Sequence, residues 1–369
     1  MYMMPILRPT VAEVDLKKLA RNMRKVHEQA GEGVRVLTVL KANAYGHGAV
    51  PLGLFLEKNK LSDFFGAASV EEALQLRQAG VTLPILVLGS IYPFEAFEYA
   101  IKNNIAITIA SLDAAKAVCE IAEKIGKKAL CHVKQDTGMG RIGTRRGGVF
   151  NVIEYLDKNP HVILDGLFTH LSSVETDPAY TEEQIGYYRD TLTNVHLKGI
   201  HINYCHVAAS SAITARPDVH YDMVRTGHSA FGLEAGFEPI LSLKTRVVYV
   251  KDVPAGASIS YNRSFIAPAP MKVATLPLGY GDGYLRALSN KAEVLINGKR
   301  CRVLGNITMD MMMVDITNAG SVKVGDEAVA VGRQGNEEIT YAELAEKAGT
   351  IDYELCTLLM MRVPRIYKE

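Results

Sequence analysis

The stretch VRVLTVL, residues 34–40, is the first of eight short apolar runs rich in β-branched residues. Candidate helices separate the runs, and SVEEALQLRQAG (69–80) and SLDAAKAVCEIAEKIG (111–126) each begin at a capping serine and end near a glycine. Strands alternating with helices are typical of βα units around a parallel sheet, and eight such units predict a (β/α)8 barrel of the TIM type. The other runs are FFGAAS (64–69), LPILVLG (83–89), IAITIA (105–110), ALCHVK (129–134), VILDGLFTH (162–170), INYCHVAA (202–209) and MVRTGHSAFG (223–232).

The pattern changes after about residue 235. Alternating strand patterns with tight turns follow, and Asn297-Gly298 is a hairpin signal within VLINGKRCRV. We therefore predict a barrel domain over 1–235 and a mostly β domain over 236–369. The first ten or so residues are expected to pack with the β domain. The strand patterns are LKTRVVYVKDV (243–253), PAGASISY (254–261), KVATLPLGY (272–280) and VLINGKRCRV (294–303).

The composition excludes several classes of protein. Hydrophobic residues make up 48% of the 369 residues and charged residues 22%, which is ordinary for a globular chain and argues against disorder. Lysine and arginine number 41 against 40 acidic residues, so the net charge of +1 offers no broad surface for nucleic acid or an anionic membrane. The apolar runs are far shorter than the roughly 18 residues of a membrane helix. A small-molecule partner is favoured.

The cysteines and the N-terminus indicate a reducing compartment. Five cysteines are an odd number and no CxxC pair occurs, which argues against a disulfide framework and against a structural zinc site. The start, MYMMPILRPT, lacks the charged region and apolar core of a signal peptide. We expect a cytoplasmic protein without a metal.

Polar residues follow the apolar runs, at the end of a barrel where active sites lie. Lys41 directly follows the first run, and a lysine at the mouth of an apolar barrel is partly desolvated, which lowers its pKa and frees its amine to form a Schiff base. A lone lysine at a strand end more often simply extends into solvent. The other residues at strand ends are Lys134, Arg141, His170, His206, Ser210, Arg225, Gly227 and His228.

Small residues and backbone amides after the seventh and eighth runs form the usual phosphate site of such barrels. A lysine and a phosphate-binding site at the same end of the barrel suit pyridoxal phosphate. Its aldehyde needs an amine, and its phosphate needs amides and hydroxyls. Taken singly, His170 is more often a packed core histidine and Ser210 a helix cap.

The motifs together resemble those of the alanine racemase family, in the same order and over nearly the whole chain. The resemblance implies a pyridoxal-phosphate enzyme with a barrel and a β domain, a homodimer that makes D-alanine for peptidoglycan. The motifs are VLKANAYGHG, KQDTGMGRIG, DGLFTH, MVRTGHSAFG, SISYNRSF, LPLGYGDGY, GNITMDMMMVD and IDYELCTLLMMRVPRIY.

The resemblance also implies a role for each site residue. Lys41 would carry the cofactor and act as the acid-base group for the D-isomer, and Tyr261, reaching over from the partner subunit, would serve the L-isomer. Arg225 would face the pyridine nitrogen, with His170 beside the ring. Arg141 would bond the cofactor's phenolic oxygen and, with the Met309 amide, the substrate carboxylate. The cofactor phosphate would be held by Tyr45, Tyr353, Ser210 and the backbone around Gly227 and His228.

Arg225 explains why such a site would racemise rather than transaminate. A guanidinium stays protonated and cannot hand the pyridine nitrogen a proton as an aspartate would, so the cofactor is a weaker electron sink. A weakly stabilised carbanion is short-lived, and it is reprotonated at the α-carbon before the cofactor carbon can take the proton.

Two positions depart from the family pattern, and a third, Lys134, matches it but leaves its modification open. Ala209 stands where asparagine is common and removes one polar contact near the phosphate, and Thr308 stands where cysteine is frequent. Lys134 matches a lysine that carries a carbamate in some members, while a chloride or a neutral arrangement replaces it in others. Both arrangements stay open for Lys134.

Three rival functions differ in what they require. A fold-related pyridoxal-phosphate decarboxylase would place a carboxylate near the pyridine nitrogen, where this chain has Arg225. A pyridoxal-phosphate-binding homeostasis protein would resemble the barrel alone, without the β segment that bears Tyr261, Met309 and Tyr353. A racemase for serine or for several amino acids shares the motifs, and it stays open.

Overall fold

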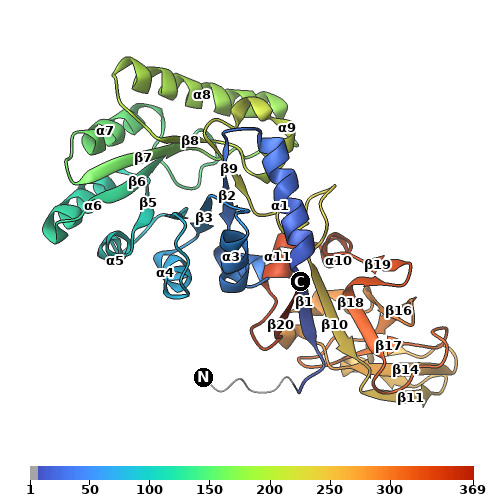
Figure 1. Cartoon of the computed structure of the whole chain (residues 1–369). Helices are drawn as coiled ribbons and strands as arrows, with labels where there is room; N and C mark the ends of the chain where they lie inside the picture. Colours follow the sequence, from blue (N-terminus) through green and yellow to red (C-terminus); the bar gives the residue numbers. More distant parts are fainter. Residues whose placement is uncertain (1–6) are drawn as a thin grey trace.

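Eight parallel strands form the barrel lobe of the computed structural model, which describes residues 7–369 (Figure 1). The strands pair in the order β8-β7-β6-β5-β4-β3-β2-β9. Backbone bonds from Asp222 to Cys205 (3.1 Å) and from Arg225 to Ala208 (3.0 Å) join β9 to β8 and close the sheet. The predicted barrel is confirmed. The strands are β2 (Arg35–Val39), β3 (Phe64–Ala67), β4 (Ile85–Val87), β5 (Ile105–Ile109), β6 (Ala129–Lys134), β7 (Val162–Phe168), β8 (Tyr204–His206) and β9 (Met223–Thr226).

Helices cover the outside of the barrel, as Figure 1 shows. Two of them carry the predicted serine caps: Ser69 accepts from the Glu72 amide (3.3 Å), and Ser111 accepts from the Ala114 amide (3.1 Å). The helices are α1 (Leu16–Ala30), α3 (Ala49–Lys58), α4 (Val70–Gln78), α5 (Ala96–Lys102), α6 (Leu112–Ile125), α7 (Arg146–Asp157), α8 (Pro178–Leu197) and α9 (Ser210–Ala215).

The second lobe is a ten-stranded sheet with a small separate hairpin. Asn297 (φ 51°) and Gly298 (φ 69°) form the two-residue turn between β15 and β16, in the left-handed conformation that their residue types favour. The strands are β10 (Leu241–Arg246), β11 (Tyr249–Val253), β14 (Met271–Leu276), β15 (Glu293–Ile296), β16 (Lys299–Leu304), β17 (Met312–Asp315), β18 (Glu327–Gln334), β19 (Glu337–Ile339) and β20 (Arg365–Lys368), with the hairpin β12 (Ser258–Ile259) and β13 (Phe265–Ile266). Helices α10 (Tyr341–Ala348) and α11 (Asp352–Thr357) complete this lobe.

The N-terminal strand β1 (Val11–Asp15) belongs to the sheet of the β domain. It lies between β10, to which it is antiparallel, and β20, to which it is parallel. Arg8 also pairs with Asp282, and Thr10 donates to the Pro277 carbonyl (2.5 Å). Of the first ten residues, expected to pack with the β domain, residues 1–6 lie outside the described part of the chain.

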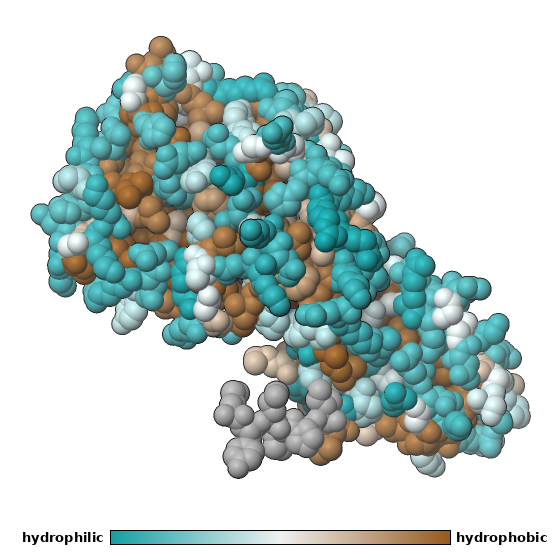
Figure 2. Space-filling view, viewed as in Figure 1, coloured by the Kyte–Doolittle hydropathy of each residue, from teal (hydrophilic) through white to brown (hydrophobic). Residues whose placement is uncertain are grey.

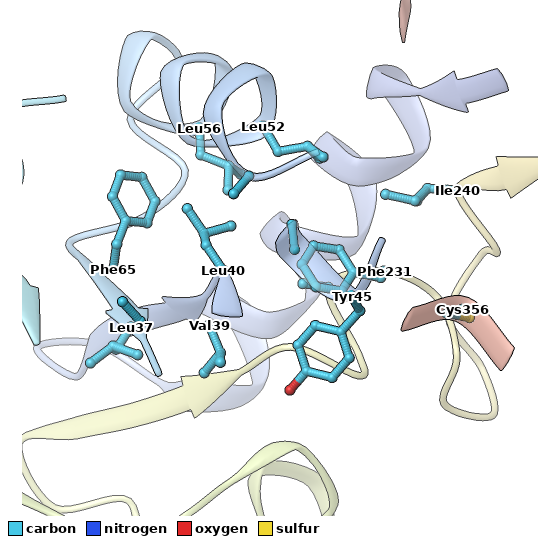
Figure 3. Close-up of a cluster of buried hydrophobic side chains, with 14 of the residues drawn as sticks. Leu37, Val39, Leu40, Tyr45, Leu52, Leu56, Phe65, Phe231, Ile240 and Cys356 are labelled. Carbon is cyan, nitrogen blue, oxygen red and sulfur yellow. The ribbon is translucent and has the colours of Figure 1, made fainter. Parts of the chain in front are cut away.

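The strand that precedes Lys41 is buried on both faces, as in parallel sheets covered by helices. Figure 3 shows Leu37 and Leu40 in an apolar cluster with Phe65 and with Leu52 and Leu56 of α3. The displayed face of both lobes is largely hydrophilic (Figure 2). Within residues 7–369, no helix is long and apolar enough to cross a membrane.

Candidate functional site

A left-handed turn follows strand β2 and begins at Lys41. The helical segment α2 (Lys41–Tyr45) contains Ala42, Asn43 and Ala44 at φ values of 50–53°, and Tyr45 has φ 52°. Left-handed backbone costs roughly 1–2 kcal/mol per residue with a Cβ, so the surrounding structure must stabilise the turn. Strain held in this way is typical of functional sites.

Side chains at the rim bind the amides of this turn. The Glu72 carboxylate accepts from the Ala42 amide (2.8 Å) and from the Ala68 amide (2.7 Å). The Asn43 side chain accepts from the Ala49 amide (2.9 Å) at the start of α3. The backbone that carries Lys41 is therefore tied to the ends of β3 and α3.

The Lys41 amine lies in a partly buried and positively charged setting. Burial lowers its pKa, the charge of Arg141 lowers it further, and Glu72 opposes the shift. Nζ is 6.0 Å from the centre of the Tyr45 ring. A lysine with a lowered pKa supplies more neutral, nucleophilic amine at neutral pH, as Schiff-base chemistry requires.

Four cations surround His170. Burial and the charges of Arg225, Lys134, Arg141 and Lys41 lower the pKa of His170 to about 3, so its imidazole is neutral at pH 7. The structure thus brings together five of the residues predicted for the site.

Asp136, an acidic group that acts on Lys134, is already engaged. Asp136 accepts from the amides of Gly138 (3.1 Å) and Gly140 (3.0 Å), and it pairs with Arg145 (3.3 Å). Within residues 7–369, no carboxylate forms an ion pair with any of the four cations. The mouth therefore suits a ligand that carries several negative charges.

Arg225 is buried and held on several sides. Its NH1 donates to the His206 carbonyl (3.1 Å) and to His206 Nδ1 (2.8 Å), and its NH2 donates to the carbonyls of Thr169 (2.8 Å) and Val207 (2.9 Å). NH2 also lies 3.5 Å from His170 Nδ1. Burial lowers the pKa of Arg225 to about 10, so the guanidinium remains charged at pH 7.

A chain of buried histidines extends from Arg225 through the barrel, and we expected no role for its members. His206 Nε2 lies 3.0 Å from His132 Nδ1, and His132 Nε2 lies 3.3 Å from the Asp165 carboxylate. Because Arg225 only donates, His206 Nδ1 must accept. His206 Nε2–H then donates to His132 Nδ1, and His132 Nε2–H donates to the Asp165 carboxylate. The only signal in the sequence was a histidine on each of the two strands, β6 and β8, that flank β7, and an aspartate on β7 itself.

Ser210 and the loop after β9 form the candidate phosphate cradle. The amides of Gly227 and Ser229 point at Ser210 Oγ, at 3.3 and 3.4 Å. A Cβ on Gly227 would lie 2.9 Å from the Tyr45 hydroxyl, so only glycine leaves this space open. Ala209 precedes α9 and makes no side-chain capping bond. An anionic group here would meet amides and hydroxyls.

Aromatic rings close this side of the site. The Tyr45 ring lies 5.3 Å from Phe231 and 5.7 Å from Tyr353, and His228 stacks on Tyr353 at 4.2 Å. Figure 3 shows the Tyr45 hydroxyl pointing away from the apolar cluster. His228 Nε2 also lies 3.1 Å from the Asp352 carboxylate of α11, so the two lobes meet here.

Tyr261 and Met309 are exposed residues of the β domain. Tyr261 begins the short helix η2 (Tyr261–Arg263) and is 69% exposed, and Met309 is 53% exposed. Within the described residues, no hydrogen bond or ring contact joins either side chain to the barrel mouth. Near Met309, Thr308 Oγ1 donates to the Met311 carbonyl (2.7 Å) and closes a tight turn.

Comparison with known proteins gives one consistent result. Family models described as the N-terminal and C-terminal domains of alanine racemase match residues 14–235 and 240–367. The chain is 41% identical to alanine racemase 2 of Caldanaerobacter subterraneus, over 98% of this chain and 95% of the relative, and 41% identical to the alanine racemase of Symbiobacterium thermophilum, over 98% and 97%.

Solved structures agree with the sequence matches. The alanine racemase of Clostridium difficile superposes with a TM-score of 0.93 at 37% identity, covering 99% of this chain and 97% of that one. The Bacillus anthracis alanine racemase with bound L-Ala-P superposes with a TM-score of 0.92 at 33% identity, covering 99% and 96%.

Proposed function

Because the chain belongs to the alanine racemase family, we propose that its barrel mouth binds pyridoxal phosphate and that two bases, Lys41 and Tyr261, exchange the α-proton of alanine there. The protein is an alanine racemase, an isomerase of a pyridoxal-phosphate-dependent family that interconverts L-alanine and D-alanine. We further propose that it works in the cytoplasm and supplies D-alanine for peptidoglycan.

The cluster of four basic side chains, Lys41, Lys134, Arg141 and Arg225, beside an amide cradle is the observation that carries this proposal. Lys41 would bind the aldehyde, and Arg141 the phenolic oxygen. The Arg225 guanidinium has NH1 and NH2 engaged, which leaves Nε–H for the pyridine nitrogen. The phosphate would meet Tyr45, Tyr353, Ser210 and the backbone of Gly227 and His228. When bound, pyridoxal phosphate withdraws electrons from the α-carbon and makes its proton acidic.

Racemisation requires a proton donor and a proton acceptor on opposite faces of the α-carbon. Lys41 would exchange the proton of the D-isomer, and its lowered pKa allows the amine to accept that proton at neutral pH. Tyr261 would exchange the proton of the L-isomer on the other face. Arg141 and the Met309 amide would orient the substrate by its carboxylate.

Arg225 and His170 would control which reaction follows. The Arg225 guanidinium is charged at neutral pH and donates a hydrogen bond without giving up its proton. Arg225 would therefore leave the pyridine nitrogen without a proton, so that the cofactor would withdraw fewer electrons and return of the proton to the α-carbon would be favoured. The neutral His170 would hold Arg225 in place from the side of the ring.

We propose that a homodimer completes the site. The segments around Tyr261 and Met309 form one continuous surface, because Asn306 donates to the Tyr261 carbonyl (3.0 Å) and Gly281 donates to the Met309 carbonyl (2.8 Å). Exposed apolar surface of this kind marks interfaces. Its placement supports delivery of Tyr261 and Met309 to the partner's Lys41. The exposed apolar side chains on these segments are Tyr261, Tyr280, Met309, Met311, Met360 and Met361.

Reductive labelling tests the assignment of the lysine. We expect the purified protein to absorb visible light, and borohydride reduction followed by peptide mapping should place the pyridoxyl group on Lys41. Lys134→Gln serves as the matched control, because it removes the other buried lysine of the mouth and should leave the label on Lys41. A label on Lys134, or no label, would contradict the proposal.

We propose that Lys134 carries a carbamate. Burial, then the charges of Arg225 and Arg141, lower the pKa of Lys134 to about 7, so much of its amine is neutral at pH 7. The neutral amine attacks carbon dioxide, a C–N bond forms and one proton is released. The product would place a negative charge among cations that have no acidic partner in the described chain.

Carbon-13 NMR tests the carbamate. Protein in 13C-bicarbonate is expected to show a carbamate resonance above pH 7, because the free amine predominates above its pKa, and to lose it as the pH falls below 7. Lys134→Gln should lack the resonance at every pH. A resonance that persists in Lys134→Gln, or is absent from the wild-type protein at pH 8, would show the proposal to be wrong.

A further inference from the structure

Side-chain donors bind four successive carbonyls in and after the left-handed turn. His47 Nδ1 lies 2.9 Å from the carbonyl oxygens of both Ala44 and Tyr45. Arg365 Nε donates to the Gly46 carbonyl (2.9 Å), and the Tyr367 hydroxyl donates to the His47 carbonyl (3.0 Å). The last two donors lie in β20, 319 and 320 residues further along the chain.

The Arg365 guanidinium is also bonded to the chain segment just before β20. Its NH1 donates to the carbonyls of Met360 (2.7 Å) and Val363 (2.7 Å), and its NH2 donates to the Leu359 carbonyl (2.6 Å). The planar guanidinium thus joins the loop before β20 to the Gly46 carbonyl. Since β20 pairs with β1, the turn that bears Lys41 is bonded to the sheet of the β domain.

The C-terminal segment also lies directly against the turn. A Cβ on Gly48 would be 1.8 Å from the Tyr367 hydroxyl, and a Cβ on Gly46 would be 2.2 Å from the Cys356 carbonyl. Both glycines have positive φ values, of 105° and 81°. The turn and the C-terminal segment therefore pack so closely that neither glycine position leaves room for a side chain.

We propose that Arg365 and Tyr367 are positioning residues for Lys41. They act through the backbone, by holding the left-handed turn so that Lys41 and Tyr45 reach the same ligand. This inference rests on the proposed function, in which Lys41 carries the cofactor and Tyr45 binds its phosphate. Loss of either donor lets the strained turn relax, and both contacts to the cofactor weaken together.

The experiment compares Tyr367→Phe and Arg365→Gln with Arg246→Gln, a control that also removes a donor to one backbone carbonyl of the β domain (Gly325, 2.8 Å) but far along the chain from the turn. We expect the dissociation constant of pyridoxal phosphate from the apo protein to rise several-fold in Tyr367→Phe and at least tenfold in Arg365→Gln. The visible circular dichroism of the bound cofactor should change in both. Hydrogen exchange of amides 44–48 should accelerate in the apo variants.

Arg246→Gln should match the wild type in all three measurements. Unchanged cofactor affinity, dichroism and exchange in Tyr367→Phe would overturn the inference, and so would equal changes in Arg246→Gln. If Arg365→Gln does not fold, Tyr367→Phe decides, because it removes one hydroxyl. Wild-type protein that takes no label on Lys41 contradicts the proposed function and this inference with it. A wild-type label together with unchanged variants contradicts the positioning role alone.

Discussion

A mixed dimer of one Lys41→Ala chain and one Tyr261→Ala chain is expected to recover close to half of the wild-type racemase activity, although each variant alone is nearly inactive. An acid-base group contributes about 10²- to 10⁴-fold to a rate, and each homodimer lacks one such group in both sites. In the mixed dimer, the intact Lys41 of one chain receives the intact Tyr261 of the other, while the second site lacks both. The two chains carry different affinity tags, so that the mixed dimer is purified before its activity is measured.

A second mixed dimer gives the opposite result and serves as the control. It pairs a wild-type chain with a chain that carries both Lys41→Ala and Tyr261→Ala. If Tyr261 serves the partner, each site of this dimer lacks one base, and the dimer is inactive. If Tyr261 serves its own chain, the wild-type chain retains a whole site and half of the activity, and the first mixed dimer stays inactive. That reversed pattern would refute the shared site.

Arg225→Glu is expected to lower racemisation by a factor of about 10² or more and to make half-transamination detectable. A carboxylate at this position lets the pyridine nitrogen keep a proton, which makes the cofactor a stronger electron sink. The proton removed from the α-carbon would then be delivered to the cofactor carbon instead of back to the α-carbon. Chiral chromatography measures the alanine enantiomers, and pyruvate measures transamination. An unchanged ratio of the two products would show that Arg225 does not control the reaction.

The surroundings of Arg225 call for a second variant. The guanidinium donates to the buried carbonyls of Thr169, His206 and Val207, and a glutamate can donate to none of them. Each buried group left without a partner costs about 1–3 kcal/mol, so Arg225→Glu should also unfold at a lower temperature. Arg225→Lys keeps a cation while losing most of these bonds. It should show the loss of stability and of racemisation without the gain in transamination, which separates structural damage from the electronic effect.

Local patterns in the sequence were sufficient to predict the barrel and the β domain. Short, continuous apolar runs rich in β-branched residues predicted all eight barrel strands, because strands buried on both faces need such runs. Asn297-Gly298 predicted its turn through the positive φ that these residues tolerate. Within the run from 223 to 232, β9 ends at Thr226, and Gly227 opens the loop of the cradle.

The sequence by itself determined where the basic residues of the candidate site lie relative to the strands, since Lys41 directly follows the first apolar run and Arg225 lies within the last. Only the tertiary structure decided what supports these residues. His132 can reach His206 only because residue 166 is a glycine: a Cβ there would lie 2.1 Å from the His132 ring. No local sequence pattern indicates that the His132 ring needs this space. Likewise, Arg365 and Tyr367 meet the lysine turn only after β1 and β20 have paired in the other lobe. Hydrogen bonds between segments some 300 residues apart depend on how two domains dock, and periodicity and capping carry no information about docking.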